Sequence, residues 1–506
     1  MKKIISIMMV VMTILSCAGG LSGCKQKENA SEDGVVTLKW VMPNAKQKDS
    51  AMVLEEFNKQ LADYLPDTRV EMEYVSAADY QEKWNLMMAA NEEIDIGWSG
   101  YALDFMSQVQ QGSYMVLNDL IEEYGADMKN DLPEWLFDLG KVGENIYCIP
   151  NYQMMSTWPQ GVRILKEYSD KYLDKAALEE AKIKSKTDIE GTKEIYKIWE
   201  KCFEGIKNEG KIGNGIDVST FGSYGGGAGD TTTVSGFSVN LDTMKVQIGA
   251  ESERTKLWYD TAADWYKKGY IRSDILSVDG LGSEQYKKGY IAWSHNWCDK
   301  TAELESKELG VELDVVKMGD EAQISNQIPV TSTVIARTSK NPERAMQLIN
   351  LLNSEKGKDL YNLLVWGIEG VHYTKTSEKR IQVPYNTSQA TSDEDYGLPN
   401  WSVASIKYSY EPQASLEGWA DYVYEIDMNA KVSPILGFRP DTSAVATEIA
   451  QIRAVTSEYA KPLKYGASEN HEELYKEYIA KLKTAGVDKV RDELQRQLDE
   501  WLEANK

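Results

Sequence analysis

The chain has 506 residues, which is enough for two or three domains with separate hydrophobic cores. Its formal net charge is -23, and so acidic a surface repels nucleic acids and anionic lipid head groups. Composition therefore argues against nucleic-acid binding and leaves any membrane attachment to a covalent lipid.

The N-terminus has the pattern of an export signal. Two lysines precede an apolar run from Ile4 to Leu15, which is too short for a permanent membrane span. The ending Leu21-Ser22-Gly23-Cys24 resembles a bacterial lipobox. This resemblance implies that residues 1–23 form a cleaved signal peptide and that Cys24 carries a lipid anchor on the outer face of the membrane. The alternative is an ordinary signal peptide whose cysteine is incidental.

Strands and helices alternate along the chain after a polar, flexible tether at residues 24–36. Apolar periodicity predicts a strand, a helix, a strand, a helix and a strand at residues 35–40, 50–65, 70–75, 79–91 and 94–98. This order is typical of the α/β class, with a largely parallel sheet and helices packed on it.

Helical patterns dominate the remaining sequence. A strand at 145–150 leaves the first domain, and helix formers are dense over residues 171–209. Further amphipathic helices are predicted at residues 254–268, 342–352, 445–459, 474–482 and 487–501. The glycine-rich run at 222–229 lacks the Gly-Lys-Ser/Thr ending of a phosphate-binding loop, and we interpret it as a surface loop.

The sequence offers little support for catalysis. His295, His372 and His471 are far apart and lie in no His-x-x-x-His pattern, so neither a metal nor another cofactor is expected. A Gly-x-Ser-x-Gly nucleophile motif is also missing from the sequence. The chain has 79 Asp and Glu residues, which leaves a glycosidase with paired carboxylates as the enzymatic alternative.

Aromatic composition gives the clearest indication of a ligand class. The chain has 14 Trp and 29 Tyr but only 7 Phe. Tyr and Trp combine an apolar ring with a polar atom, and a sugar-binding cleft needs both, although most of these rings are expected in cores. Cys148, Cys202 and Cys298 form no disulfide framework or zinc signature, and we interpret them as small buried residues, with one bridge left open.

Several segments carry a resemblance to a known family. They are the lipobox with its tether, the opening that ends at 91–96, Tyr286–Trp293 and Ser339–Gly357. Together they resemble family 1 extracellular solute-binding lipoproteins of ABC importers, a group similar to maltose- and oligosaccharide-binding proteins. The run 360–373 and the ending 437–501 resemble a subgroup with a C-terminal domain of unknown function.

The resemblance implies two α/β lobes with mixed sheets, two or three crossing segments and a C-terminal helical extension. The expected parts are residues 37–150 with 318–362 for lobe 1, residues 151–317 with 363–436 for lobe 2, and residues 437–506 for the helical domain.

The same resemblance implies a monomer that closes on a sugar or oligosaccharide and delivers it, chemically unchanged, to the permease of an ABC importer. One alternative is an amino-acid or peptide receptor, for which Arg163 is the candidate anchor. The other is the glycosidase.

Ligands of open α/β sheets lie beyond the carboxyl ends of the strands, so the loops after the strands supply the expected contacts. The predicted ligand-binding residues are Trp40, Asn44, Trp98, Ser99, Tyr101, Asp104, Tyr152, Trp158, Tyr224, Trp293, His295, Trp297 and Trp366. The structural alternative for Trp40 and Trp293 is a place in the core, and that for Asp104 is a helix cap.

Overall fold

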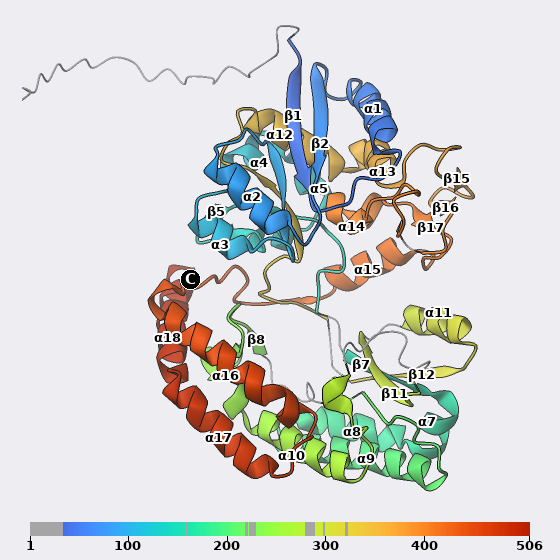
Figure 1. The fold of residues 1–506 in the computed structure, drawn as a ribbon, viewed down its shortest axis with the longest axis vertical. Helices are drawn as coiled ribbons and strands as arrows, with labels where there is room; N and C mark the ends of the chain where they lie inside the picture. Colours follow the sequence, from blue (N-terminus) through green and yellow to red (C-terminus); the bar gives the residue numbers. More distant parts are fainter. Residues whose placement is uncertain are drawn as a thin grey trace, which may run out of the picture.

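A computed structural model describes residues 34–157, 160–217, 221, 229–278, 289–296, 299–318, 322–387 and 389–505. They form two lobes, one above the other along the longest axis, with thin segments of chain between them (Figure 1). In this described part of the chain, no helix is long and apolar enough to cross a membrane.

The first lobe is built on a five-stranded sheet in the order β2-β1-β3-β14-β6. Strand β1 pairs in parallel with β2 and with the central strand β3, and β14 runs antiparallel between β3 and β6. The strands are β1 (Val36–Met42), β2 (Thr68–Tyr74), β3 (Ile96–Gly100), β6 (Ile149–Pro150) and β14 (Thr331–Ile335). The predicted α/β order is thus confirmed, within a mixed sheet.

Each face of this sheet carries its own hydrophobic cluster. Side chains alternate along a strand, so Trp40 and the adjacent Val41 belong to different clusters. Helix α1 (Ser50–Leu61) buries Val53 and Phe57 against the cluster of Trp40. Helix α2 (Tyr80–Ala89) buries Trp84 in the other cluster. Strands β1 and β3 are therefore covered by hydrophobic side chains on both faces of the sheet.

Shorter elements complete the first lobe. Its other helices are α3 (Phe105–Gln110), α4 (Asn118–Tyr124), α5 (Ala126–Asp131), α6 (Glu134–Asp138), α12 (Pro342–Leu352), α13 (Lys358–Trp366) and α14 (Asn400–Val403). Strand β4 (Lys141–Val142) pairs with β5 (Asn145–Ile146). A separate three-stranded sheet has the order β15 (Thr374–Lys375), β16 (Arg380–Gln382) and β17 (Glu411–Pro412).

The first lobe extends further along the chain than its expected limit. Trp366, Tyr373 and Leu398 are buried in the same cluster as the residues of β1. The resemblance places residues 363–436 in the second lobe, whereas the structure packs this segment as far as Ile406 into the first. The physical reason is that α13 and the turns after it bury their apolar side chains against α1 and β1.

The second lobe contains two small antiparallel sheets, ordered β11-β7-β12 and β10-β9-β8. The strands are β7 (Gln160–Leu165), β8 (Gly229–Thr231), β9 (Phe237–Asn240), β10 (Lys245–Ile248), β11 (Ala292–Asn296) and β12 (Leu313–Lys317). The helices are α7 (Lys166–Tyr172), α8 (Lys175–Ser185), α9 (Ile189–Asn208), α10 (Glu253–Lys267) and α11 (Asp299–Leu309). An aromatic cluster joins α9 to α10, with the rings of Phe203 and Trp265 5.3 Å apart.

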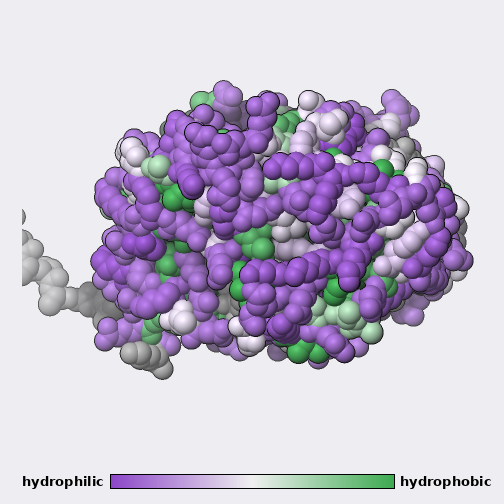
Figure 2. Space-filling model, turned by 90° about the horizontal axis from the view of Figure 1, so that it is seen from below, coloured by the Kyte–Doolittle hydropathy of each residue, from purple (hydrophilic) through white to green (hydrophobic). Residues whose placement is uncertain are grey.

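The three C-terminal helices belong to the second lobe rather than standing apart. Helices α16 (Ala446–Lys464), α17 (His471–Thr484) and α18 (Val487–Ala504) line one side of the lower lobe (Figure 1). Ile452, Leu482 and Leu494 share one hydrophobic cluster with Trp199 of α9. Seen from below, the outer face is mainly hydrophilic, with small separate hydrophobic groups (Figure 2). The C-terminal helices therefore complete the core of this lobe.

Candidate functional site

Three segments of chain cross between the lobes and pair with one another. In the first, Thr157 forms an antiparallel bridge with Gln323 of β13 (Gln323–Ile324), in the second. Strand β13 then pairs in parallel with β18 (Lys431–Val432), in the third. Backbone hydrogen bonds thus join all three crossings into one narrow ribbon, the geometry of a hinge rather than of a loose linker.

Asp427, in the last turn of α15 (Trp419–Met428), fixes the first crossing. Its buried carboxylate accepts hydrogen bonds from the Tyr152 hydroxyl (3.1 Å), the Met155 amide (2.9 Å), and both the amide and the hydroxyl of Ser156. Burial raises the pKa of Asp427 above its usual value, although these donors work in the opposite direction. Within the described residues, hydrogen bonds from neutral donors hold this carboxylate, and no cation is among its bonded partners.

Arg439 connects the other two crossings. This residue is only 8% exposed, and its guanidinium donates to the side-chain oxygen of Asn326 and to the backbone oxygens of Gln327 (2.9 Å) and Leu139 (3.2 Å). The backbone amide of Asn326 in turn donates to the Asp230 carboxylate of β8 at 2.7 Å. Burial lowers the pKa of Arg439 to about 10. A single network therefore links the first lobe, the second crossing and the second lobe.

An exposed aromatic ring lies on the first lobe beside the second crossing. Tyr101 follows β3, is 58% exposed, and lies 5.0 Å from the ring of Trp98 and 6.1 Å from that of Trp401. Its amide donates to the backbone oxygen of Val330, which is also exposed and directly precedes β14. Partial burial raises the pKa of Tyr101. We call Tyr101, Val330 and Trp401 the hinge aromatic surface.

A pocket of about 1150 Å³ lies on the second lobe at the other end of the ribbon. Three parts of the molecule line it: the sheet β8–β10, the N-terminal ends of α9 and α10, and the crossing residues Thr157, Ser325 and Gln327. We call this cavity the second-lobe pocket. The ribbon is thus bordered by an aromatic surface on one lobe and a polar cavity on the other.

The predicted ligand-binding residues separate into accessible and buried groups. Tyr101 is accessible, and so is Asp104, although its carboxylate caps α3 by accepting from the Ser107 amide at 2.7 Å. Asn44 is half-buried, and its side-chain nitrogen makes no hydrogen bond within the described residues. Six side chains are at most 2% exposed, namely Trp40, Trp98, Ser99, Tyr152, Trp293 and Trp366.

These six residues are placed for packing in this structure, because each lies inside a lobe. Trp40 and Trp98 sit on opposite faces of the first-lobe sheet, under its helices. Trp366 lies on α13 in the first-lobe core, and Trp293 donates to the Glu305 carboxylate at 3.1 Å. None of the six presents a surface to a ligand, so among the aromatic predictions that fall on described residues Tyr101 is the accessible one.

Other predicted positions have a different outcome. His295 takes part in β11, where its backbone pairs with Gly161. Cys24, Trp158, Tyr224, Trp297 and Cys298 lie outside the described residues, while Cys148 and Cys202 are free and buried. Arg163, the anchor expected of an amino-acid receptor, is fully buried and forms a 2.9 Å ion pair with Glu305. Its charge is already matched within the second lobe.

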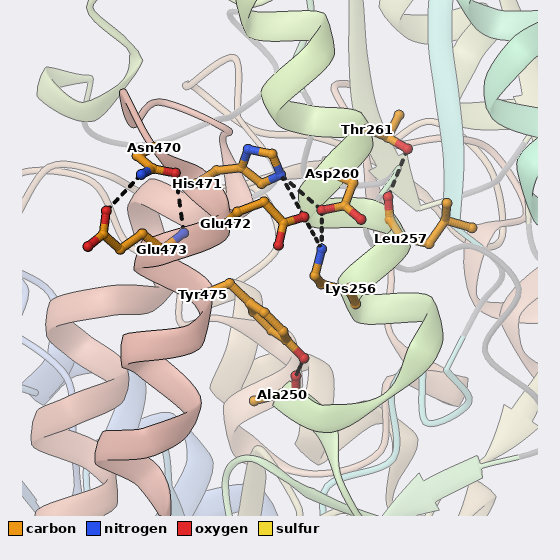
Figure 3. A network of polar contacts seen from close by, with 10 residues as sticks. All are labelled: Ala250, Lys256, Leu257, Asp260, Thr261, Asn470, His471, Glu472, Glu473 and Tyr475. Carbon is orange, nitrogen blue, oxygen red and sulfur yellow. Dashed lines mark hydrogen bonds and ion pairs between the residues drawn. The ribbon is translucent and has the colours of Figure 1, made fainter.

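One group in the described part of the chain has metal-ligating atoms close together, namely Asp260, His471 and Glu472. It lies between α10 and α17 (Figure 3). The ammonium of Lys256 already contacts the Asp260 carboxylate at 2.5 Å and the Glu472 carboxylate at 2.8 Å. A lysine therefore supplies the positive charge at this position, and the network joins the C-terminal helices to α10.

Sequence reasoning missed the hinge residues Asp427, Asn326 and Arg439. Asp427 lies four residues after the buried Val423, so a carboxylate on the apolar face of α15 was an available signal. Asn326 and Arg439 carried no comparable signal, because their partners are distant in sequence and lie in extended segments.

Comparison with known proteins agrees with this architecture. The chain is 24% identical over 505 residues to the carbohydrate ABC transporter substrate-binding protein of Streptococcus pneumoniae serotype 4, with 97% of this chain and 96% of the relative covered. Residues 434–503 match the family model described as domain of unknown function DUF3502. This match begins at the third crossing and includes all three C-terminal helices.

The fold is also similar to that of the N-glycan transport solute binding protein NgtS from Streptococcus pneumoniae, at 22% identity. One NgtS structure aligns with a TM-score of 0.73, covering 93% of this chain and 100% of that one. The complex with Man1GlcNAc aligns at 0.63 with coverages of 92% and 99%, and that with Man5GlcNAc at 0.60 with 93% and 99%. The chain therefore has the two-lobed fold of solute-binding proteins and resembles a carbohydrate ABC transporter substrate-binding protein over nearly its whole length.

Proposed function

We propose that this protein captures a sugar or oligosaccharide between its two lobes and delivers it to an ABC importer. The named relative is a carbohydrate transporter component, and the NgtS complexes contain mannose-based glycans. The observation that carries the proposal is the exposed ring of Tyr101 at the margin of a three-segment hinge. An aromatic face can stack on the C–H face of a sugar, and a hinge lets the second lobe close over it.

Closure would be driven by contacts that the ligand makes with both lobes. A ligand shifts such an equilibrium only by its differential affinity for the closed form, so a ligand touching one lobe alone leaves the protein open. This mechanism needs no chemistry on the ligand, and we infer a binding protein rather than a glycosidase.

We also infer that the protein works outside the cytoplasm. Residues 1–23 would be removed as a signal peptide, and Cys24 would carry the lipid that holds a monomer near the permease. Metabolic labelling of expressing cells with a radioactive fatty acid tests the lipid anchor separately. The label should enter the wild-type chain and be absent from the Cys24→Ala variant.

The test of ligand capture uses the soluble chain that begins after Cys24. A thermal-shift screen compares mono- and oligosaccharides, including Man1GlcNAc and Man5GlcNAc, with amino acids and short peptides. Stabilisation is expected only with carbohydrate, and about 2.7 kcal/mol at a ligand concentration of 100 Kd. Small-angle X-ray scattering should show a smaller radius of gyration with the same ligand.

Two results would contradict the proposal. Stabilisation by amino acids or peptides alone would favour the receptor alternative. Cleavage of a glycan by the purified chain would favour the glycosidase. It would be measured by chromatography of the products and should be lost on substitution of one Asp or Glu.

A further inference from the structure

We propose that the second-lobe pocket is a separate subsite for one end of an uncharged oligosaccharide. The inference rests on the proposed function and adds to it that the ligand is longer than a monosaccharide. The volume of the second-lobe pocket is about 1150 Å³, above the range of about 300–1,000 Å³ usual for small-molecule sites. The cavity therefore has room for more than one sugar ring.

The floor of the pocket is a row of hydroxyl and amide groups. Thr231 of β8 pairs with Ser238 of β9, which pairs with Gln247 of β10, so the three side chains stand side by side across the sheet. All three line the pocket. The alternate residues Val239 and Val246 are buried in the lobe core on the opposite face. Because side chains alternate along strands, the core holds this polar row in place.

The charges around the pocket favour an uncharged ligand. Its charged lining residues are two cations and four anions: Lys186, Arg254, Asp188, Asp230, Asp242 and Glu253. Arg254 already donates to the Thr192 hydroxyl and to the Ser185 backbone oxygen. An excess of negative charge repels phosphates and carboxylates, whereas sugar hydroxyls can donate to carboxylates and to Gln247.

The position of the pocket connects it with the first lobe. Gln327 lines the pocket, and Val330, three residues later in the same crossing, binds the amide of Tyr101. Three residues of extended chain span at most about 11 Å, so the pocket and the hinge aromatic surface are separated by only a few sugar rings. An oligosaccharide that reached both would touch both lobes, which is the condition for closure.

The test measures dissociation constants by calorimetry for Man1GlcNAc and Man5GlcNAc. Gln247→Trp fills the pocket from an exposed position. It should weaken Man5GlcNAc at least tenfold and change Man1GlcNAc by less than twofold. Lys197→Trp is the control, because Lys197 is exposed farther along α9 and does not line the pocket, and it should leave both constants unchanged.

The double variant Ser238→Ala/Gln247→Ala removes hydrogen bonds without adding bulk, and it should show the same length dependence if Gln247→Trp does not fold. Equal effects on the two glycans, or no effect on either, would overturn the subsite while leaving the proposed function standing. Binding of neither glycan by the wild-type chain would instead contradict the proposed function for mannose-based glycans, and the subsite with it.

Discussion

The hydroxyl of Tyr152 donates a 3.1 Å hydrogen bond to the carboxylate of Asp427, although the two residues are 275 positions apart. Tyr152 stands at the start of the first crossing, and Asp427 precedes the third. The pair therefore ties two passages of the chain together at the point where the lobes meet. A rigid attachment here confines any bending to the short ribbon that follows.

Removing this carboxylate should destabilise the whole protein. Asp427→Ala leaves the buried amides of Met155 and Ser156 without acceptors, and each unsatisfied buried group costs about 1–3 kcal/mol. We expect a loss of about 2–4 kcal/mol in the free energy of unfolding, measured in urea. Asp421→Ala on the same helix is the control, because its carboxylate pairs only at the surface with Lys379, and it should change stability by less than about 0.5 kcal/mol. Equal losses would contradict a special role for Asp427.

Tyr101 should contribute to affinity rather than to folding. Its ring is mostly exposed, so Tyr101→Ala should leave the melting temperature of the free protein nearly unchanged. Binding of a carbohydrate ligand should weaken about tenfold, which corresponds to about 1.4 kcal/mol of lost aromatic contact. Tyr101→Phe keeps the ring and should lose less than about threefold, as measured by calorimetry. A loss for Phe as large as that for Ala would assign the interaction to the hydroxyl instead.

The docking of α17 on α10 should weaken in acid. The hydrogen bond and charge of Lys256 lower the pKa of Glu472 (Figure 3). A lowered folded-state pKa gives stability that is present above the unfolded value of about 4.3 and is lost as the pH falls through that value and below. Glu472→Gln should therefore melt at a lower temperature than wild type at pH 7, and the difference should shrink between about pH 5 and pH 3. Glu503→Gln, at an exposed position on α18, should show no such convergence.

The turn between α16 and α17 should tolerate only glycine. Gly466 has a positive φ of 63°, and a Cβ there would lie 2.2 Å from the backbone of Ala262 on α10. Gly466→Ala should cost about 1–2 kcal/mol for the backbone conformation and about 1–3 kcal/mol more for the clash. Gly210→Ala has a similar φ of 71° with open space around it, so it should show only the first cost in chemical unfolding. Equal costs would mean that the turn shifts without penalty.

Sequence periodicity predicted the elements well, because it depends on near neighbours. The helix at 487–501 appears as α18, with Val490, Leu494 and Leu498 buried along one face. Parallel pairing of β1 with β2 and β3 likewise followed from their alternation with helices. These features required no knowledge of distant parts of the chain.

The candidate site was harder to predict because burial at a strand end depends on distant segments. Trp98 was expected to face a ligand, but it lies in a strand between β1 and β14, beneath α2. Tyr101, three residues later, remains exposed. Trp401, whose ring lies beside that of Tyr101, comes from a segment assigned by the resemblance to the other lobe. A rule based on strand ends identified the right loop but could not separate its core residues from its surface residues.

The three crossings have a consequence for the way this protein must be made. The first lobe takes its core from β1 near the N-terminus and from residues as late as Ile406, while the second needs Leu498. Neither lobe is a continuous stretch of chain, so neither can complete its core early in synthesis. The first lobe must wait for Ile406 and the second for α18, and truncation by even that one helix would leave the second lobe unfinished.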